Sequence, residues 1–193
     1  MTWFKTNSYT IVKMIIQQFG IAIMSIIFIG GALGGDSRLG LIGSVFCTLF
    51  YLALLYTMCW DEGAKAGIRA DAMHAKKDTL GGLKLSLFAN IPNALLAFLM
   101  LIGFLFGGVI TEAAWAQGLY TVVHLLALIW ESMYLGFITF FLPSAETAAT
   151  SGYYLVAYTL TILPALFASW LGYFMGLRNK RMFGSLFAPK KKG

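Results

Sequence analysis

Charged side chains are scarce in this chain: Asp, Glu, Lys and Arg make up 11% of its 193 residues, whereas a soluble domain carries about 25%. Apolar side chains make up 59%, and the mean hydropathy is +0.78. Together these values exclude a disordered chain, a solvated coiled coil and an ordinary soluble enzyme. They indicate a protein whose solvent is lipid.

Catalytic and metal-binding motifs are also missing. The sequence contains no HExxH, GxSxG, P-loop or GxGxxG motif, and it has only two histidines and two cysteines. Cys47 and Cys59 lie twelve residues apart, which is about 18 Å along one helix and too far for a disulfide. We therefore expect no enzymatic activity, no cofactor and no metal. The formal charge of +6 is expected to face lipid headgroups rather than a nucleic acid.

Long uncharged runs are what the sequence has instead. A transmembrane helix needs about 20 mostly apolar residues, and the runs do not alternate as the strands of a membrane barrel do. We therefore predict an all-α, polytopic membrane bundle that forms a single domain over residues 1–193. The uncharged runs are Met14–Gly35, Leu39–Trp60, Leu85–Thr111, Ala113–Trp130 and Thr147–Leu177.

Five transmembrane segments account for these runs, and a sixth is left open because residues 85–177 have room for four. The first two segments are expected to form an antiparallel hairpin. A short surface helix is expected to continue from the second segment into a polar connection, residues 61–84, and a basic tail occupies residues 178–193. The predicted spans are residues 10–33, 39–60, 83–110, 119–142 and 153–175.

The positive charges conflict with an odd number of crossings. Thirteen of the 14 Lys and Arg residues lie in the N-terminal end, the polar connection and the tail. Five full spans would divide the charges equally, whereas an even number of crossings would collect thirteen on one side, as the positive-inside rule prefers. Either a sixth span or a segment that enters and returns on one side gives even parity. We predict a cell (cytoplasmic) membrane location with the N-terminus and residues 61–84 cytoplasmic, and leave the side of the tail open.

Glu131 is the one acidic residue well inside a predicted span. Such a group is costly in lipid and usually faces a bundle interior or an aqueous cavity. His124 lies two helical turns earlier on the same face, and Tyr134 adds a hydroxyl group. The functional interpretation is a proton or cation site. The structural alternative is a carboxylate solvated near an interface or at a break between two shorter helices.

Asn90, Pro92 and Asn93 form a second polar point, in the first half of the third segment. A proline removes one helical hydrogen bond, and broken helices hold substrates or ions in many transporters. Pro164 would free another carbonyl group in the fifth segment. The structural alternative is an ordinary kink that neighbouring helices satisfy.

Glycines four residues apart allow close helix packing. We expect such pairs to form helix contacts within the chain or in a homo- or hetero-oligomer. The pairs are Gly30 with Gly34, Gly31 with Gly35, Gly103 with Gly107, and Gly172 with Gly176.

The basic tail is expected to bind a bilayer with anionic headgroups, at about 1 kcal/mol per charge, or to serve only as a solvated end that sets topology. Its charged residues are Arg178, Lys180, Arg181, Lys190, Lys191 and Lys192.

Two functions fit these features. The first is a membrane component of a transport or permeation system, with Glu131, His124 and the proline-bearing segments along the pathway. The second is a non-catalytic accessory subunit that binds partner membrane proteins through its glycine faces and residues 61–84.

Overall fold

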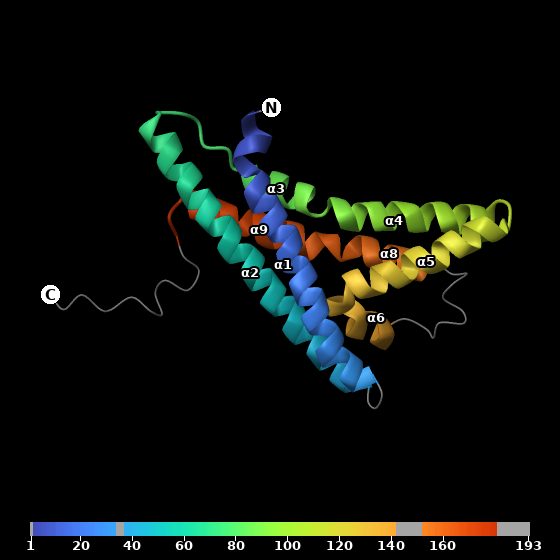
Figure 1. Ribbon diagram of the computed structural model, residues 1–193. Coiled ribbons are helices and arrows are strands. Elements are labelled where there is room, and N and C mark those ends of the chain that lie inside the picture. Colours follow the sequence, from blue (N-terminus) through green and yellow to red (C-terminus); the bar gives the residue numbers. More distant parts are fainter. Residues whose placement is uncertain (1, 34–36, 142–151, 181–193) are drawn as a thin grey trace.

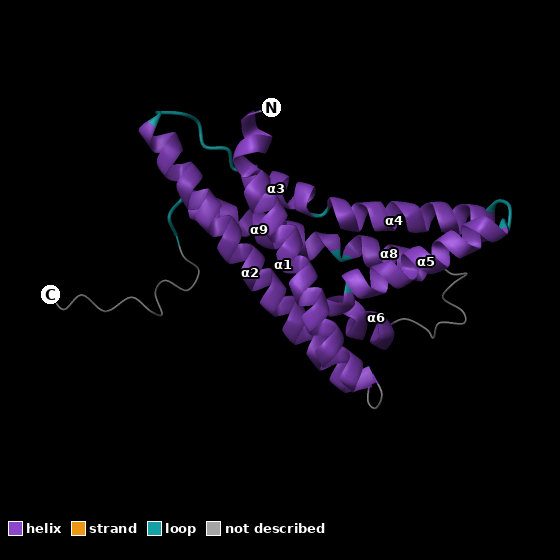
Figure 2. Cartoon of the chain, in the orientation of Figure 1, coloured by secondary structure: helices purple, strands orange, loops and turns teal. Residues whose placement is uncertain are grey.

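The computed structural model describes residues 2–33, 37–141 and 152–180, and this part of the chain contains helices but no strand (Figures 1 and 2). The all-helical prediction is confirmed for these residues. The elements are α1 (Thr2–Leu33), α2 (Ser37–Ala72), α3 (Gly81–Ala89), α4 (Ile91–Phe104), the π-helical turn η1 (Leu105–Val109), α5 (Ala114–Trp130), the 3₁₀ turn η2 (Ser132–Tyr134), α6 (Leu135–Phe141), α8 (Tyr153–Leu160) and α9 (Ile162–Leu177).

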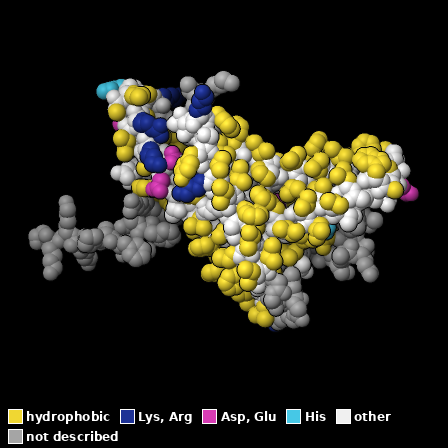
Figure 3. Space-filling view, in the orientation of Figure 1, with side chains coloured by type: hydrophobic (Ala, Val, Ile, Leu, Met, Phe, Trp, Pro, Cys, Tyr) yellow, Lys and Arg dark blue, Asp and Glu magenta, His cyan; other side chains and the backbone are white. Residues whose placement is uncertain are grey.

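The long helices have lipid-compatible surfaces. Four helical stretches are long and apolar enough to cross a membrane, or five if the bent pair α5 and α6 counts as one span. Large apolar side chains such as Ile16, Phe98 and Phe167 are more than half exposed. Hydrophobic side chains cover most of the face in Figure 3, whereas Lys and Arg gather near the N-terminus and the end of α2. These surfaces agree with a multi-pass membrane protein.

Helix α2 runs 36 residues without interruption. As the sequence predicts, the helix of the second span continues into the polar connection, and it ends at Ala72, because the alanines of the connection sustain the helix. Residues 73–80 are exposed and carry the chain to α3. There the Lys84 ammonium lies 2.7 Å from the Asp78 carboxylate.

Helices α2 and α9 pack with their backbones in close contact through glycines of both helices. A Cβ atom on Gly172 would meet the Tyr56 carbonyl oxygen, and one on Gly176 would meet that of Trp60. On the other side of the contact, Cβ atoms on Gly63 and Gly67 would meet the carbonyl oxygens of Tyr173 and Leu177.

Two predicted spans are interrupted near their prolines. The third span, predicted as one helix, breaks at Asn90 into α3 and α4, and Pro92 occupies the first turn of α4. The fifth span breaks at Thr161, and Pro164 lies in the first turn of α9. A proline fits the first turn of a helix, where its missing N–H group leaves no bond broken, but not the interior. The breaks therefore lie a few residues before each proline.

The two ends of the described chain lie at the same end of the bundle (Figure 1). The Phe4 ring contacts the Phe88 ring of α3, with centroids 5.5 Å apart. The Trp60 indole N–H of α2 donates to the Lys180 carbonyl oxygen at 2.7 Å. The turn after η1 lies far from this end in the same view.

Candidate functional site

The chain bends by 79° where α5 gives way to η2 and α6, and Glu131 lies at the bend. The predicted fourth span, residues 119–142, is therefore two helices rather than one. The Glu131 N–H group still donates to Ala127 as the last bond of α5, and its carbonyl oxygen accepts from Tyr134 N–H at 2.9 Å. No glycine or proline occupies residues 131–134, so tertiary contacts must hold the bend.

Side chains of α2 and the backbone of α1 satisfy the polar groups that the bend frees. The Ser132 hydroxyl donates to the Ala22 carbonyl oxygen at 2.7 Å. The Gly136 N–H group donates to the Ser44 hydroxyl oxygen at 2.7 Å, and the Thr48 hydroxyl group donates to the Met133 carbonyl oxygen at 3.3 Å. Backbone polar groups inside a membrane need such internal partners, so the bend is a built feature of the bundle.

The Glu131 side chain is buried inside the protein, with 2% of its surface exposed. Its Oε2 atom lies 2.5 Å from the Thr161 hydroxyl oxygen, at the break between α8 and α9. None of the ion pairs found in the described residues includes it. A carboxylate without a cation is expensive to bury, so this environment favours the neutral acid.

Hydrogen-bond geometry at Thr161 agrees with a protonated Glu131. The hydroxyl oxygen also lies 2.6 Å from the Tyr158 carbonyl oxygen. A hydroxyl group has only one hydrogen, and both neighbours are acceptors if Glu131 is ionised. A protonated Glu131 that donates to Thr161, whose hydroxyl group then donates to Tyr158, would satisfy both short contacts at once.

His124 lies in an aromatic cluster between α5 and α8. Its ring centroid is 4.9 Å from that of Tyr154, and 5.9 Å from those of Tyr120 and Tyr158. The structure therefore connects His124 to Glu131 through Tyr158 and Thr161, not by direct contact.

Several buried polar atoms of the aromatic cluster and of Tyr134 lack a hydrogen-bond partner within the described residues. They are the hydroxyl oxygens of Tyr120, Tyr134 and Tyr158 and Nε2 of His124. Buried polar groups are almost always paired in proteins, so this concentration points to a site for water or a small ligand.

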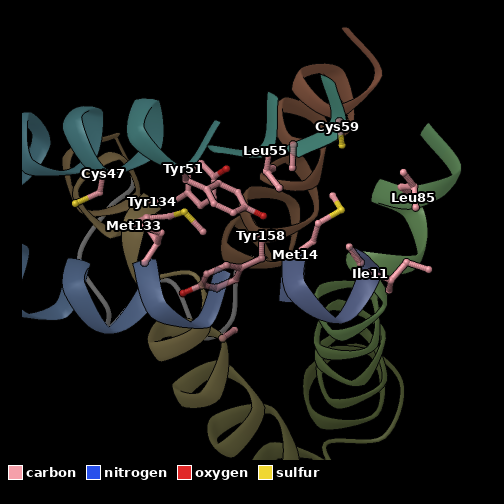
Figure 4. Close-up of a cluster of buried hydrophobic side chains, with 14 of the residues drawn as sticks. Ile11, Met14, Cys47, Tyr51, Leu55, Cys59, Leu85, Met133, Tyr134 and Tyr158 are labelled. Atoms are coloured by element: carbon pink, nitrogen blue, oxygen red, sulfur yellow. The ribbon is translucent and has the colours of Figure 1, made fainter. Parts of the chain in front are cut away.

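Tyr134, the third predicted member of the site, lies in η2 close enough to Glu131 for the two to interact electrostatically. Tyr51 of α2 interacts with both in the same way. Figure 4 shows Tyr51, Tyr134 and Tyr158 in one cluster of buried side chains. The carboxyl group is thus surrounded by phenol groups from three helical elements.

Asn90 and Asn93 form a separate network around the break between α3 and α4. Asn93 accepts from the Gln18 amide at 2.9 Å and from the Trp130 indole, and it donates to the Asn90 amide oxygen at 3.0 Å. Asn90 donates to the Ser86 carbonyl oxygen at 2.8 Å. Because these amides already bond to protein groups, the network is better suited to holding the break than to binding a substrate. Pro92 and Pro164 contribute the breaks themselves.

A cavity of about 340 Å³ lies between α4, η1 and α5. Tyr120, one of its lining residues, also carries one of the unpaired buried hydroxyl groups, and its ring contacts that of His124. The cavity is lined by Gly103, Phe104, Gly107, Gly108, Gln117, Tyr120 and Thr121.

The predicted packing glycines whose surroundings the structure describes lie in α4, η1 and α9. A Cβ atom on Gly103 would lie 2.8 Å from the Tyr120 nitrogen, and one on Gly107 would lie 3.0 Å from the Gln117 nitrogen. Gly172 of α9 packs on α2, like Gly176. The side chains of residues 30–37, among them both predicted N-terminal glycine pairs, lie outside those described.

In the tail, Arg178 and Lys180 are exposed, and the Arg178 guanidinium lies 4.1 Å from the Phe174 ring centroid. The other predicted headgroup ligands lie outside the described residues. They are Arg181, Lys190, Lys191 and Lys192.

Sequence reasoning missed Thr161 and Tyr158. The sequence pattern that could have identified Tyr158 is the four-residue spacing of Tyr154 and Tyr158, which matches the spacing of Tyr120 and His124. Among the residues that the structure describes, no group of three or more His, Cys, Asp or Glu could hold a metal ion. Comparison of the chain with protein-family models, curated proteins and solved structures finds no match.

Proposed function

We propose that the chain is a membrane component of a proton-transport or proton-permeation system, in which Glu131 binds and releases the proton. One observation carries the proposal: a carboxyl group that is 2% exposed has a hydroxyl group as its hydrogen-bond partner and unpaired phenol groups around it. Intramembrane acids without a cationic partner are typical of proton relays. The hydrogen-bonding of Thr161 supports a proton rather than a metal cation as the bound species.

The accessory-subunit alternative receives less support from the glycines. That function requires glycine faces that are free to meet a partner helix. Gly103 and Gly107 pack against α5 of the same chain, and Gly172 and Gly176 pack against α2. These two pairs are therefore already used for internal packing.

The arrangement of the helices supports four crossings together with a re-entrant segment made of α5 and α6. Four crossings return the chain to the side on which it began, which agrees with the contacts of Phe4 and Lys180 at one end of the bundle. The basic regions then share the cytoplasmic side. The 17 residues of α5 reach about 26 Å, so the re-entrant segment is long enough to carry Glu131 well past the middle of a hydrocarbon core of about 30 Å.

Proton flux into reconstituted vesicles tests this function. A potassium diffusion potential would drive the flux, and a pH-sensitive dye inside the vesicles would report it. Wild-type protein should acidify the lumen faster than empty vesicles, and Glu131→Gln should lose this flux because an amide cannot release a proton. Glu112→Gln, at an exposed acid in the turn before α5, is the matched control and should keep it. Absence of flux in the wild type, or full flux in Glu131→Gln, would contradict the proposal.

A further inference from the structure

Two helices face each other with matched rows of aromatic polar side chains. Tyr120 and His124 lie one turn apart on α5, and Tyr154 and Tyr158 lie one turn apart on α8. The ring centroids of Tyr154 and Tyr158 are 6.4 Å apart, and both rings contact His124. The rows therefore interleave and form one ladder between the helices.

Three atoms of this ladder are buried and without a partner within the described residues: the hydroxyl oxygens of Tyr120 and Tyr158 and Nε2 of His124. Tyr158 is 2% exposed, and Tyr120 is 6% exposed. A ligand that can both donate and accept hydrogen bonds would satisfy all three atoms. Water does both, and buried waters typically hold about three bonds to otherwise unsatisfied groups.

The ladder has a different chemical environment at each end. At one end Tyr120 lines the cavity of about 340 Å³, which has room for several water molecules. At the other end the Tyr158 side chain lies close enough to Glu131 for the two to interact electrostatically, and the Thr161 hydroxyl group, three residues further along, contacts the Glu131 carboxyl group. The ladder thus joins a space that can hold water to the buried acid.

We propose that water molecules bound along this ladder form the route by which protons exchange between the cavity and Glu131. Each transfer breaks one O–H or N–H bond and forms another on the neighbouring oxygen or on His124 Nε2, so the step is redox-neutral and needs no co-reactant. His124 accepts a hydrogen bond or a proton at Nε2 when Nδ1 carries the hydrogen. The importance of this route for transport rests on the proposed function, but access of protons to Glu131 can be measured without any flux.

Infrared spectroscopy of the purified protein in lipid tests the route. The carbonyl stretch of a protonated Glu131 is identified as the band that Glu131→Gln removes, and its shift after transfer to D₂O gives the exchange rate of the carboxyl proton. Tyr158→Phe keeps the ring and removes the unpaired hydroxyl group. We expect it to slow exchange about tenfold, the size of one lost hydrogen-bonded contact. Tyr153→Phe, at a residue of α8 that is 55% exposed, is the matched control and should exchange at the wild-type rate.

Tyr120→Phe, at the cavity end, provides a second variant if Tyr158→Phe does not fold, and it should also slow exchange. Wild-type exchange rates in both folded tyrosine variants would overturn the route. A band that Glu131→Gln leaves unchanged would overturn it at its first step, because Glu131 would not carry a proton. Slowed exchange without wild-type flux would support the route and refute the transport function, whereas flux with unchanged exchange would refute the route alone.

Discussion

A methyl group at Gly176 should destabilise the bundle, because α9 lies too close to α2 to accept it. The added Cβ atom would meet the Trp60 carbonyl oxygen, and it would lie 2.9 Å from the Ala64 nitrogen and 3.0 Å from the Trp60 carbonyl carbon. All three are backbone atoms, which cannot rotate away as a side chain would. The two helices must therefore separate.

The size of this effect follows from two opposing terms. Overpacking a core costs about 1–3 kcal/mol, and rigid backbone contacts place Gly176→Ala near the upper value. The better helix propensity of alanine offsets about 1 kcal/mol. We therefore expect a net loss of about 2 kcal/mol, or about a 30-fold change in the folding equilibrium.

Unfolding in mixed micelles with increasing denaturing detergent, followed by circular dichroism, measures this loss. Gly20→Ala is the matched control, since a Cβ atom on this glycine of α1 has no neighbour within 4 Å. It should be as stable as the wild type or more so. Equal transitions for Gly176→Ala and the wild type would refute the close α2–α9 packing.

Three further predictions concern the breaks, the polar connection and the topology. Asn93→Ala removes three side-chain hydrogen bonds and should lower the free energy of unfolding by about 2 kcal/mol, at about 0.6 kcal/mol for each bond, in the same detergent titration. The hydrogen bond that Lys84 donates to Asp78 holds the pKa of the Asp78 carboxyl group below its usual range. This ion pair contributes on the order of 0.5 kcal/mol to stability, as is usual for an exposed pair. The contribution is present at neutral pH and should disappear as pH falls through the lowered pKa of Asp78. Faster hydrogen exchange at the start of α3 would detect the loss. Lys76→Cys and Lys180→Cys should react with an impermeant maleimide from one side of the membrane, and Glu112→Cys from the other.

Each of these predictions has a contradicting outcome. An Asn93→Ala protein that unfolds with the wild type would show that the amide network does not hold the break. Local protection that rises as the solution is acidified would reverse the sign expected for Asp78. Labelling of Lys76→Cys and Lys180→Cys from opposite sides would exclude an even number of crossings.

The helical bundle could be predicted from the sequence because uncharged runs of span length have few other solutions in lipid. The bend at Glu131 was only one of the alternatives that the sequence left open, since it contains no glycine or proline and depends on contacts with Ser44 and Thr48 of α2. These contacts join residues far apart in the chain, so no local sequence pattern predicts them. The two prolines, Pro92 and Pro164, indicated that these spans are interrupted, but the breaks lie two and three residues earlier, at Asn90 and Thr161.

Part of the candidate site was also predictable. Glu131 and His124 were identified because titratable residues are rare in membrane segments. Thr161 was missed because a threonine in an apolar segment is unremarkable, and only its hydrogen bond to Glu131 at the bend gives it a role. The glycines of α2 that meet α9, Gly63 and Gly67, were overlooked because they lie in the polar connection, where no span was expected.

Parallel measurement of chemical modification and proton flux in wild-type vesicles tests the role of Glu131 most directly. A hydrophobic carbodiimide reacts with protonated carboxyl groups that lie in lipid-like surroundings, and mass spectrometry gives the modified fraction of Glu131. We predict that the remaining flux falls in proportion to this fraction and vanishes when every Glu131 is modified. Undiminished flux through fully modified protein would contradict the account.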